Sequence, residues 1–125
     1  MACGADKDRL LGIDKELSLG GVFPSRRIVN WYNGSLDNDI QEEKDLNLEN
    51  SRDVIIIGNG NIFCDISRML LKDAESFNNS DMPESVINSL KRSKIKNIQS
   101  VARRGITHAA FTTKEIREIG AIPDI

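Results

Sequence analysis

The chain has few of the residues that build metal centres and disulfide frameworks. Its 125 residues include one histidine and two cysteines, with no Cys-x-x-Cys pair. Cys3 and Cys64 therefore define neither a zinc site nor a disulfide framework. His108 alone cannot form a histidine-based metal cluster, and we expect it to be polar surface. The sequence thus predicts no metal site, and its cysteine usage is typical of a reducing compartment.

Long apolar runs and an excess of basic charge are missing as well. No stretch approaches the ~18 uninterrupted apolar residues of a membrane span. The first residues have neither an apolar signal core nor an arginine-rich transit pattern. Lysine and arginine total 17 against 19 acidic residues, a net charge of −2, which argues against a general nucleic-acid surface. We expect one domain with no membrane span and no nucleic-acid partner.

The order of the expected elements is typical of a parallel α/β sheet. Val54–Ile57 is a β-branched run that ends at Gly58, which indicates a strand buried on both faces. Residues 96–102 indicate a second strand, and the long crossover between the two favours parallel pairing. Helices are expected over residues 25–34, 61–72 and 83–92 and after residue 112. We therefore predict an α/β fold with a parallel sheet flanked by helices.

Composition divides the chain into an arm, a domain and an internal loop. Residues 1–22 mix charges, glycines and scattered leucines without a period, so we expect a leading arm before a domain over residues 23–125. Residues 35–53 are acidic and rich in asparagine, which predicts a solvated loop.

Several residues are typical of helix ends. Ser25 is placed to cap the first helix, and Gly34 suits its left-handed end. Asp81 is able to cap the third helix. Thr112 and Glu115 have the spacing of a capping box, which predicts that the last helix begins there.

A glycine-rich turn joins the first strand to the second helix. Gly58 would allow the tight turn and Gly60 a close approach of the backbone to a ligand. The helix that follows would offer free N–H groups and its positive dipole end to a diphosphate, with amides from Asn59 and Asn61. Phe63 departs from the usual small third residue, so its ring should push helix and strand apart or turn aside. An ordinary Asn-Gly hairpin turn is the alternative.

Two adjacent arginines follow the second strand. Guanidinium groups bind phosphate oxygens bidentately, so Arg103 and Arg104 are candidates to select NADP over NAD through the 2′-phosphate. A solvated basic face is the alternative for this pair. For the basic residues over 91–96 we expect plain solvation.

Five segments, taken together and in order, resemble the NADP domain of the adrenodoxin reductase family, the mitochondrial-type ferredoxin–NADP reductases. They are residues 21–34, Gly58–Asp65, Ile66–Leu71, Val101–Gly105 and Ala110–Glu118. The resemblance implies a flavoprotein that carries electrons from NADPH through FAD to a ferredoxin- or adrenodoxin-type iron–sulfur protein, in mitochondria. It also implies that the arm is a remnant of the FAD-domain side. We expect an excised, Rossmann-like NADP(H)-binding domain with a parallel sheet flanked by helices, inactive alone because it lacks the FAD site.

The same resemblance implies roles for individual residues. The cofactor-binding set that it implies, together with the glycine that opens the turn, is Gly58, Asn59, Gly60, Asn61, Ile62, Arg103, Arg104 and Glu115. Glu118 and Asp65 match acids near the nicotinamide in the family. No catalytic residue and no metal ligand is expected.

Each of these acids also has a purely structural interpretation. Glu115 could serve only the capping box, Glu118 could be an isolated surface acid, and Asp65 could favour the helix dipole. Three further side chains are expected in the core rather than at a cofactor: Trp31, Tyr32 and Cys64.

Two other functions remain open from the sequence. One is the NADPH-accepting domain of a related flavin oxidoreductase, similar to part of a glutamate synthase, which would differ in its electron acceptor. The other is a non-catalytic nucleotide-binding or interaction module that uses the basic residues 91–96 as a contact surface.

Overall fold

Helices and strands follow one another along the chain in the order that the sequence predicts. The computed structural model describes residues 9–16, 18–36 and 46–123, so Cys3 and part of the leading arm lie outside the described residues. Its elements are α1 (Ser25–Tyr32), β1 (Asp53–Ile57), α2 (Asn61–Leu71), η2 (Ala74–Phe77), α3 (Glu84–Lys91), β2 (Asn97–Val101), η3 (Ile106–His108) and α4 (Thr113–Ile119). No helix in these ranges is long and apolar enough to cross a bilayer.

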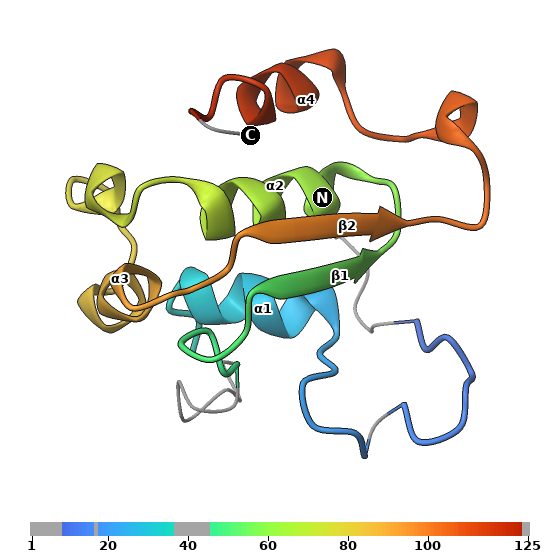
Figure 1. Ribbon diagram of the computed structural model, residues 1–125, viewed down its shortest axis with the longest axis horizontal. Coiled ribbons are helices and arrows are strands. Elements are labelled where there is room, and N and C mark those ends of the chain that lie inside the picture. Colours follow the sequence, from blue (N-terminus) through green and yellow to red (C-terminus); the bar gives the residue numbers. More distant parts are fainter. Residues whose placement is uncertain (1–8, 17, 37–45, 124–125) are drawn as a thin grey trace.

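The two strands form a parallel pair, as predicted. Asp53 pairs with Asn97 at one end of the register and Ile57 with Val101 at the other. Between them the chain passes through α2, η2 and α3, which makes the long crossover that parallel strands require. Figure 1 shows α1 and α2 running alongside the strands, with α4 beyond α2. The predicted α/β class is confirmed.

The hydrophobic core lies between the helices and one face of the sheet. Trp31 of α1 is buried in it, which confirms one of the expected core residues, and Tyr32 packs against it. Cys64 of α2 is also buried, as expected. The core cluster consists of Trp31, Leu48, Met69, Ala74, Val86, Leu90 and Ile95.

The expectation that β1 is buried on both faces is wrong. Ile55 and Ile57 are 63% and 59% exposed, and Val101 on β2 is 50% exposed. Successive side chains of a strand point to opposite faces, and the described helices cover only the face that carries Val54 and Ile56. The β-branched run therefore predicted the strand correctly, but it did not show that one face of the strand is exposed.

Two of the predicted helix caps are wrong, and one helix end is confirmed. Pro24 and Pro83 occupy the N-cap positions of α1 and α3, without a side-chain cap hydrogen bond. Ser25 is already the first residue of its helix, and Asp81 lies two residues before the cap, so neither side chain caps the helix. Gly34 follows α1 with φ of +62°, the left-handed end that was predicted.

The predicted solvated loop over residues 35–53 is only partly correct. Residues 37–45 lie outside the described residues. Leu48 is buried in the core cluster, and its carbonyl oxygen accepts a hydrogen bond from the Lys94 backbone N–H at 2.9 Å. The end of this segment therefore packs against the domain before β1 begins.

Candidate functional site

The turn after β1 has the geometry of an anion-binding helix start. Gly58 adopts φ of +138°, a conformation that L side chains rarely adopt, and Gly60 is the N-cap of α2. Within the described residues no side chain caps α2, so its first-turn amides are not occupied by a capping oxygen. A Cβ atom built on either glycine meets no atom within 4 Å. The first-turn N–H of Phe63 donates to the Gly60 carbonyl oxygen at 3.0 Å, and open space lies beside both glycines at the positive end of the helix dipole.

The turn is fixed to the second strand. Gly58 donates its backbone N–H to the carbonyl oxygen of Val101 at 2.9 Å, and the Ser100 hydroxyl donates to the Gly58 carbonyl oxygen at 2.9 Å. Because the strands are parallel, the residues that follow β2 leave the sheet at the same edge as the turn. The site therefore lies at the carboxyl ends of both strands, where ligands of open α/β sheets bind.

Arg103 and Arg104 lie in the loop that leaves this edge, directly after β2. Both are exposed, and in the described part of the chain neither is engaged in an ion pair. Their guanidinium groups are therefore available to an external anion. The lysines over 91–96 are exposed before the opposite end of β2, as expected, but Arg92 forms an ion pair with Glu49 rather than being merely solvated. His108 is exposed with a contact of 3.1 Å to Thr107.

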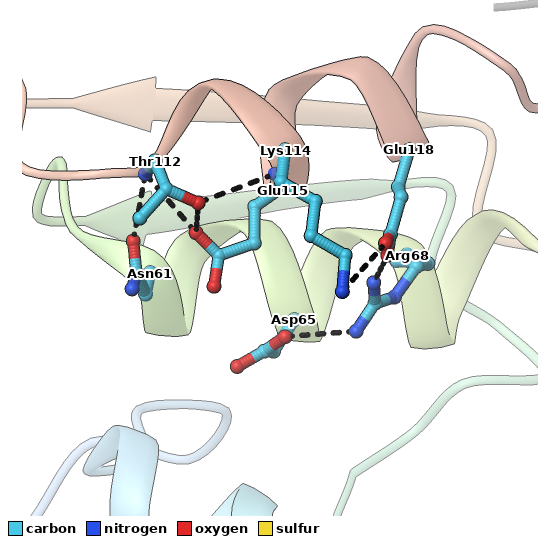
Figure 2. Close-up of polar contacts among 7 residues, drawn as sticks. All are labelled: Asn61, Asp65, Arg68, Thr112, Lys114, Glu115 and Glu118. Atoms are coloured by element: carbon cyan, nitrogen blue, oxygen red, sulfur yellow. Dashed lines mark hydrogen bonds and ion pairs between the residues drawn. The ribbon is translucent and has the colours of Figure 1, made fainter.

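The turn is also fixed to the segment that leads into α4. The Asn59 carbonyl oxygen accepts from the Ala110 backbone N–H at 2.8 Å. The Asn61 side-chain oxygen accepts from the Thr112 backbone N–H at 3.1 Å (Figure 2). Asn61 thus has a structural role that the sequence analysis missed. Its amide NH₂ group stays the part of the side chain that can donate to a ligand.

Glu115 forms the capping box predicted for the last helix. Its carboxylate accepts from both the backbone N–H, at 3.0 Å, and the hydroxyl of Thr112, while its own N–H donates to that hydroxyl at 3.4 Å. The hydroxyl bond lowers the pKa of Glu115, and the nearby cations Arg68 and Lys114 lower it further. Glu115 is therefore held as a carboxylate next to the Asn61–Thr112 contact.

Arg68 of α2 connects the two remaining acids. Its Nη2 atom contacts the Asp65 carboxylate at 2.9 Å, and its Nη1 atom donates to Glu118 of α4. Lys114 lies 3.8 Å from the same glutamate (Figure 2). Glu118 is therefore not an isolated surface acid. The three-residue spacing of Asp65 and Arg68 could have revealed one half of this pairing, but the contact with α4 required the fold.

Burial is uneven around the first turns of α2, where Ile62 is exposed but Cys64 is buried. Burial raises the pKa of the Cys64 thiol, and burial followed by the charge of Asp65 raises the pKa of Tyr32. Phe63 is half-buried. In the described ranges no three His, Cys, Asp or Glu side chains could hold a metal ion together.

Known proteins match this chain over nearly its whole length. The human mitochondrial NADPH:adrenodoxin oxidoreductase is 36% identical over 123 residues, which are 98% of this chain and 24% of the relative. A probable NADPH:adrenodoxin oxidoreductase from Saccharomyces cerevisiae is 40% identical over 95% of the chain and 25% of the relative. The chain is homologous to one segment of these oxidoreductases. It spans about a quarter of their length, and no protein-family model matches it.

Solved structures agree with this assignment. Mycobacterium tuberculosis FprA in complex with NADPH superposes with a TM-score of 0.83 at 32% identity, over 98% of this chain and 26% of FprA. A second FprA structure gives a TM-score of 0.84 at the same identity and coverage. The resemblance to adrenodoxin reductases and the Rossmann-like fold are thereby confirmed for this segment.

Proposed function

We propose that this chain binds NADP(H) as the nucleotide-binding segment of a reductase. The reductase passes electrons from NADPH through FAD to a ferredoxin- or adrenodoxin-type iron–sulfur protein. Residues 23–125 form the binding unit, and the relatives named as mitochondrial support a mitochondrial location.

One observation carries the proposal. The uncapped N-terminus of α2 follows the glycine turn at the carboxyl end of β1. Two exposed arginines follow the carboxyl end of β2, which lies at the same end of the parallel pair. A dinucleotide with a 2′-phosphate presents two anionic groups that such an edge fits, because N–H groups bind the diphosphate and guanidinium groups bind the monophosphate. The homology to NADPH:adrenodoxin oxidoreductases and the likeness to an NADPH complex of FprA support the same ligand.

Different residues bind different parts of the nucleotide. The backbone of Gly58–Ile62 binds the diphosphate, and the open space in front of Gly58 and Gly60 admits it. Arg103 and Arg104 bind the 2′-phosphate. Glu115 engages Thr112 through Oε2, which leaves Oε1 to accept a hydrogen bond from the dinucleotide.

This segment binds and orients the nucleotide, and we assign no catalytic role to any of its described residues. The hydride comes from NADPH, and the flavin site belongs to the other three-quarters of a protein of the relatives' length. The protein's contribution here is the choice of NADPH over NADH and the placement of the nucleotide.

Titration calorimetry with two small ligands tests the proposal on the chain as it stands. We expect 2′,5′-ADP to bind at least tenfold more tightly than 5′-ADP, because only the first carries the phosphate for the arginine pair. Affinity for 2′,5′-ADP should also fall as salt rises, since the contacts are charged. Equal affinities for the two ligands, or no binding of either, would reject an NADP(H) site.

A further inference from the structure

α4 is held against α2 by polar contacts rather than by a hydrophobic core. None of its residues is buried, yet it packs alongside α2. Among the described residues, the polar contacts between this segment and α2 with its turn are the Ala110–Asn59 and Thr112–Asn61 hydrogen bonds at one end and the Arg68–Glu118 ion pair at the other. Figure 2 shows these side chains facing one another across the two helices.

The ion pair fixes the part of α4 that the hydrogen bonds do not reach. The Thr112–Asn61 hydrogen bond anchors only the N-cap of α4, about which the helix could rotate. Glu118 lies near the other end of α4, and Arg68 lies two turns along α2 from Asn61. With both ends held, Glu115 keeps one position over the start of α2.

Arg68 also compensates acidic charge beside an anion site. It contacts Asp65 and Glu118 together, and its side chain is only 34% exposed. The planar guanidinium group has the donors to serve two carboxylates at once, which a lysine ammonium does with less defined geometry. Lys114 approaches the same glutamate, but it belongs to α4 and is 85% exposed, so it does not connect the helices.

We propose that Arg68 is the positioning residue of the nucleotide site, because it fixes α4 and Glu115 relative to the diphosphate turn through Glu118. This inference rests on the proposed NADP(H) site. Arg68 itself need not touch the ligand, so it should contribute equally to the affinity for NADP⁺ and to the affinity for NAD⁺. Discrimination between them stays with the arginine pair after β2.

Calorimetric titration of variants with NADP⁺ and NAD⁺ tests this role. Arg68→Met should lower the affinity for both nucleotides about tenfold and leave the ratio of the two affinities unchanged. The affinities of Arg68→Lys should lie between those of Arg68→Met and of the original chain. Lys114→Met, which removes the other cation at Glu118, should change affinity less than twofold. Unchanged affinity in Arg68→Met, or a loss confined to NADP⁺, would overturn the proposal.

Glu118→Gln separates positioning from charge compensation. It removes a negative charge near an anionic ligand, so a purely electrostatic role for Arg68 predicts tighter binding. Positioning predicts weaker binding, and no further loss in the double variant Arg68→Met/Glu118→Gln. A thermal melting curve is recorded for each variant. Weaker nucleotide binding at an unchanged melting temperature supports the proposal. A loss of affinity that occurs only together with a large drop in melting temperature contradicts it.

If the unaltered chain shows no preference for NADP⁺ over NAD⁺, the proposed function fails whatever Arg68 does. If that preference is present and Arg68→Met binds normally, only the positioning role fails. The two results are therefore distinguishable in one set of titrations.

Discussion

The Gly58 N–H donates to the Val101 carbonyl oxygen at 2.9 Å, one residue beyond the paired strands. This bond extends the hydrogen bonding between the two parallel strands into the turn. The glycine turn after β1 and the loop that carries Arg103 and Arg104 therefore begin from one hydrogen-bonded point, rather than from two independent strand ends. Preorganisation of this kind reduces the entropy that a ligand must offset when it binds.

The two turn glycines should respond differently to alanine. Gly58 has φ of +138°, so Gly58→Ala should lower the free energy of unfolding by about 1–3 kcal/mol through backbone strain. Gly60 has φ of −120° with open space around it, so Gly60→Ala should cost less, up to about 1 kcal/mol, because alanine is a poorer N-cap than glycine.

Nucleotide binding completes this comparison. The Cβ atom of Gly60→Ala would occupy the space through which the diphosphate approaches, so the stable variant should lose NADP⁺ affinity. Urea unfolding and calorimetry measure the two effects. A Gly60→Ala protein that binds normally would show that the ligand does not approach this backbone.

Gly34 combines a left-handed backbone with a close neighbour. Its φ is +62°, and an added Cβ atom would lie 2.6 Å from Cγ of Pro83. Gly34→Ala should therefore lower the free energy of unfolding by about 1–3 kcal/mol. Gly20→Ala is the matched control, because no atom lies within 4 Å of that position and its φ is ordinary. Equal stability of the two variants in urea would contradict the tight α1 end.

The capping box predicts an acid dependence of stability. The Thr112 hydroxyl lowers the pKa of Glu115 below its ordinary value of 4.5. A carboxylate with a lowered pKa in the folded state contributes stability above its ordinary pKa, and this stability is lost as pH falls through the lowered value. Glu115→Gln and Thr112→Ala should each make the midpoint of urea unfolding depend less on pH below pH ~4.5. An acid dependence that persists in both variants would assign it to other groups.

The sequence predicted the elements of this fold better than their surroundings. Val54–Ile57 indicated a strand because β-branched residues suit extended backbone, but exposure of Ile55 and Ile57 depends on which helices cover the sheet. Ser25 and Asp81 had suitable side chains for caps, yet the prolines beside them set where the helices begin.

The candidate site shows the same division. The glycine turn and the Thr112–Glu115 capping box were predictable because their residues are neighbours in the chain. The contacts of Asn61 with Thr112 and of Arg68 with Glu118 join residues that are 51 and 50 positions apart. Local patterns carry no information on such pairs, and only the packing of α4 on α2 revealed them.

The preference of the chain for NADP⁺ over NAD⁺ tests the central claim most directly. The variant to measure is Arg103→Ala/Arg104→Ala, with Lys94→Ala/Lys96→Ala as a control that removes the same charge before the opposite end of β2. A charge-assisted hydrogen bond contributes about 1.5–3 kcal/mol, so the arginine variant should lose at least ~tenfold in NADP⁺ affinity and bind NAD⁺ as before. The lysine control should keep the full preference. An arginine variant that still prefers NADP⁺ as strongly as the unaltered chain would contradict the account.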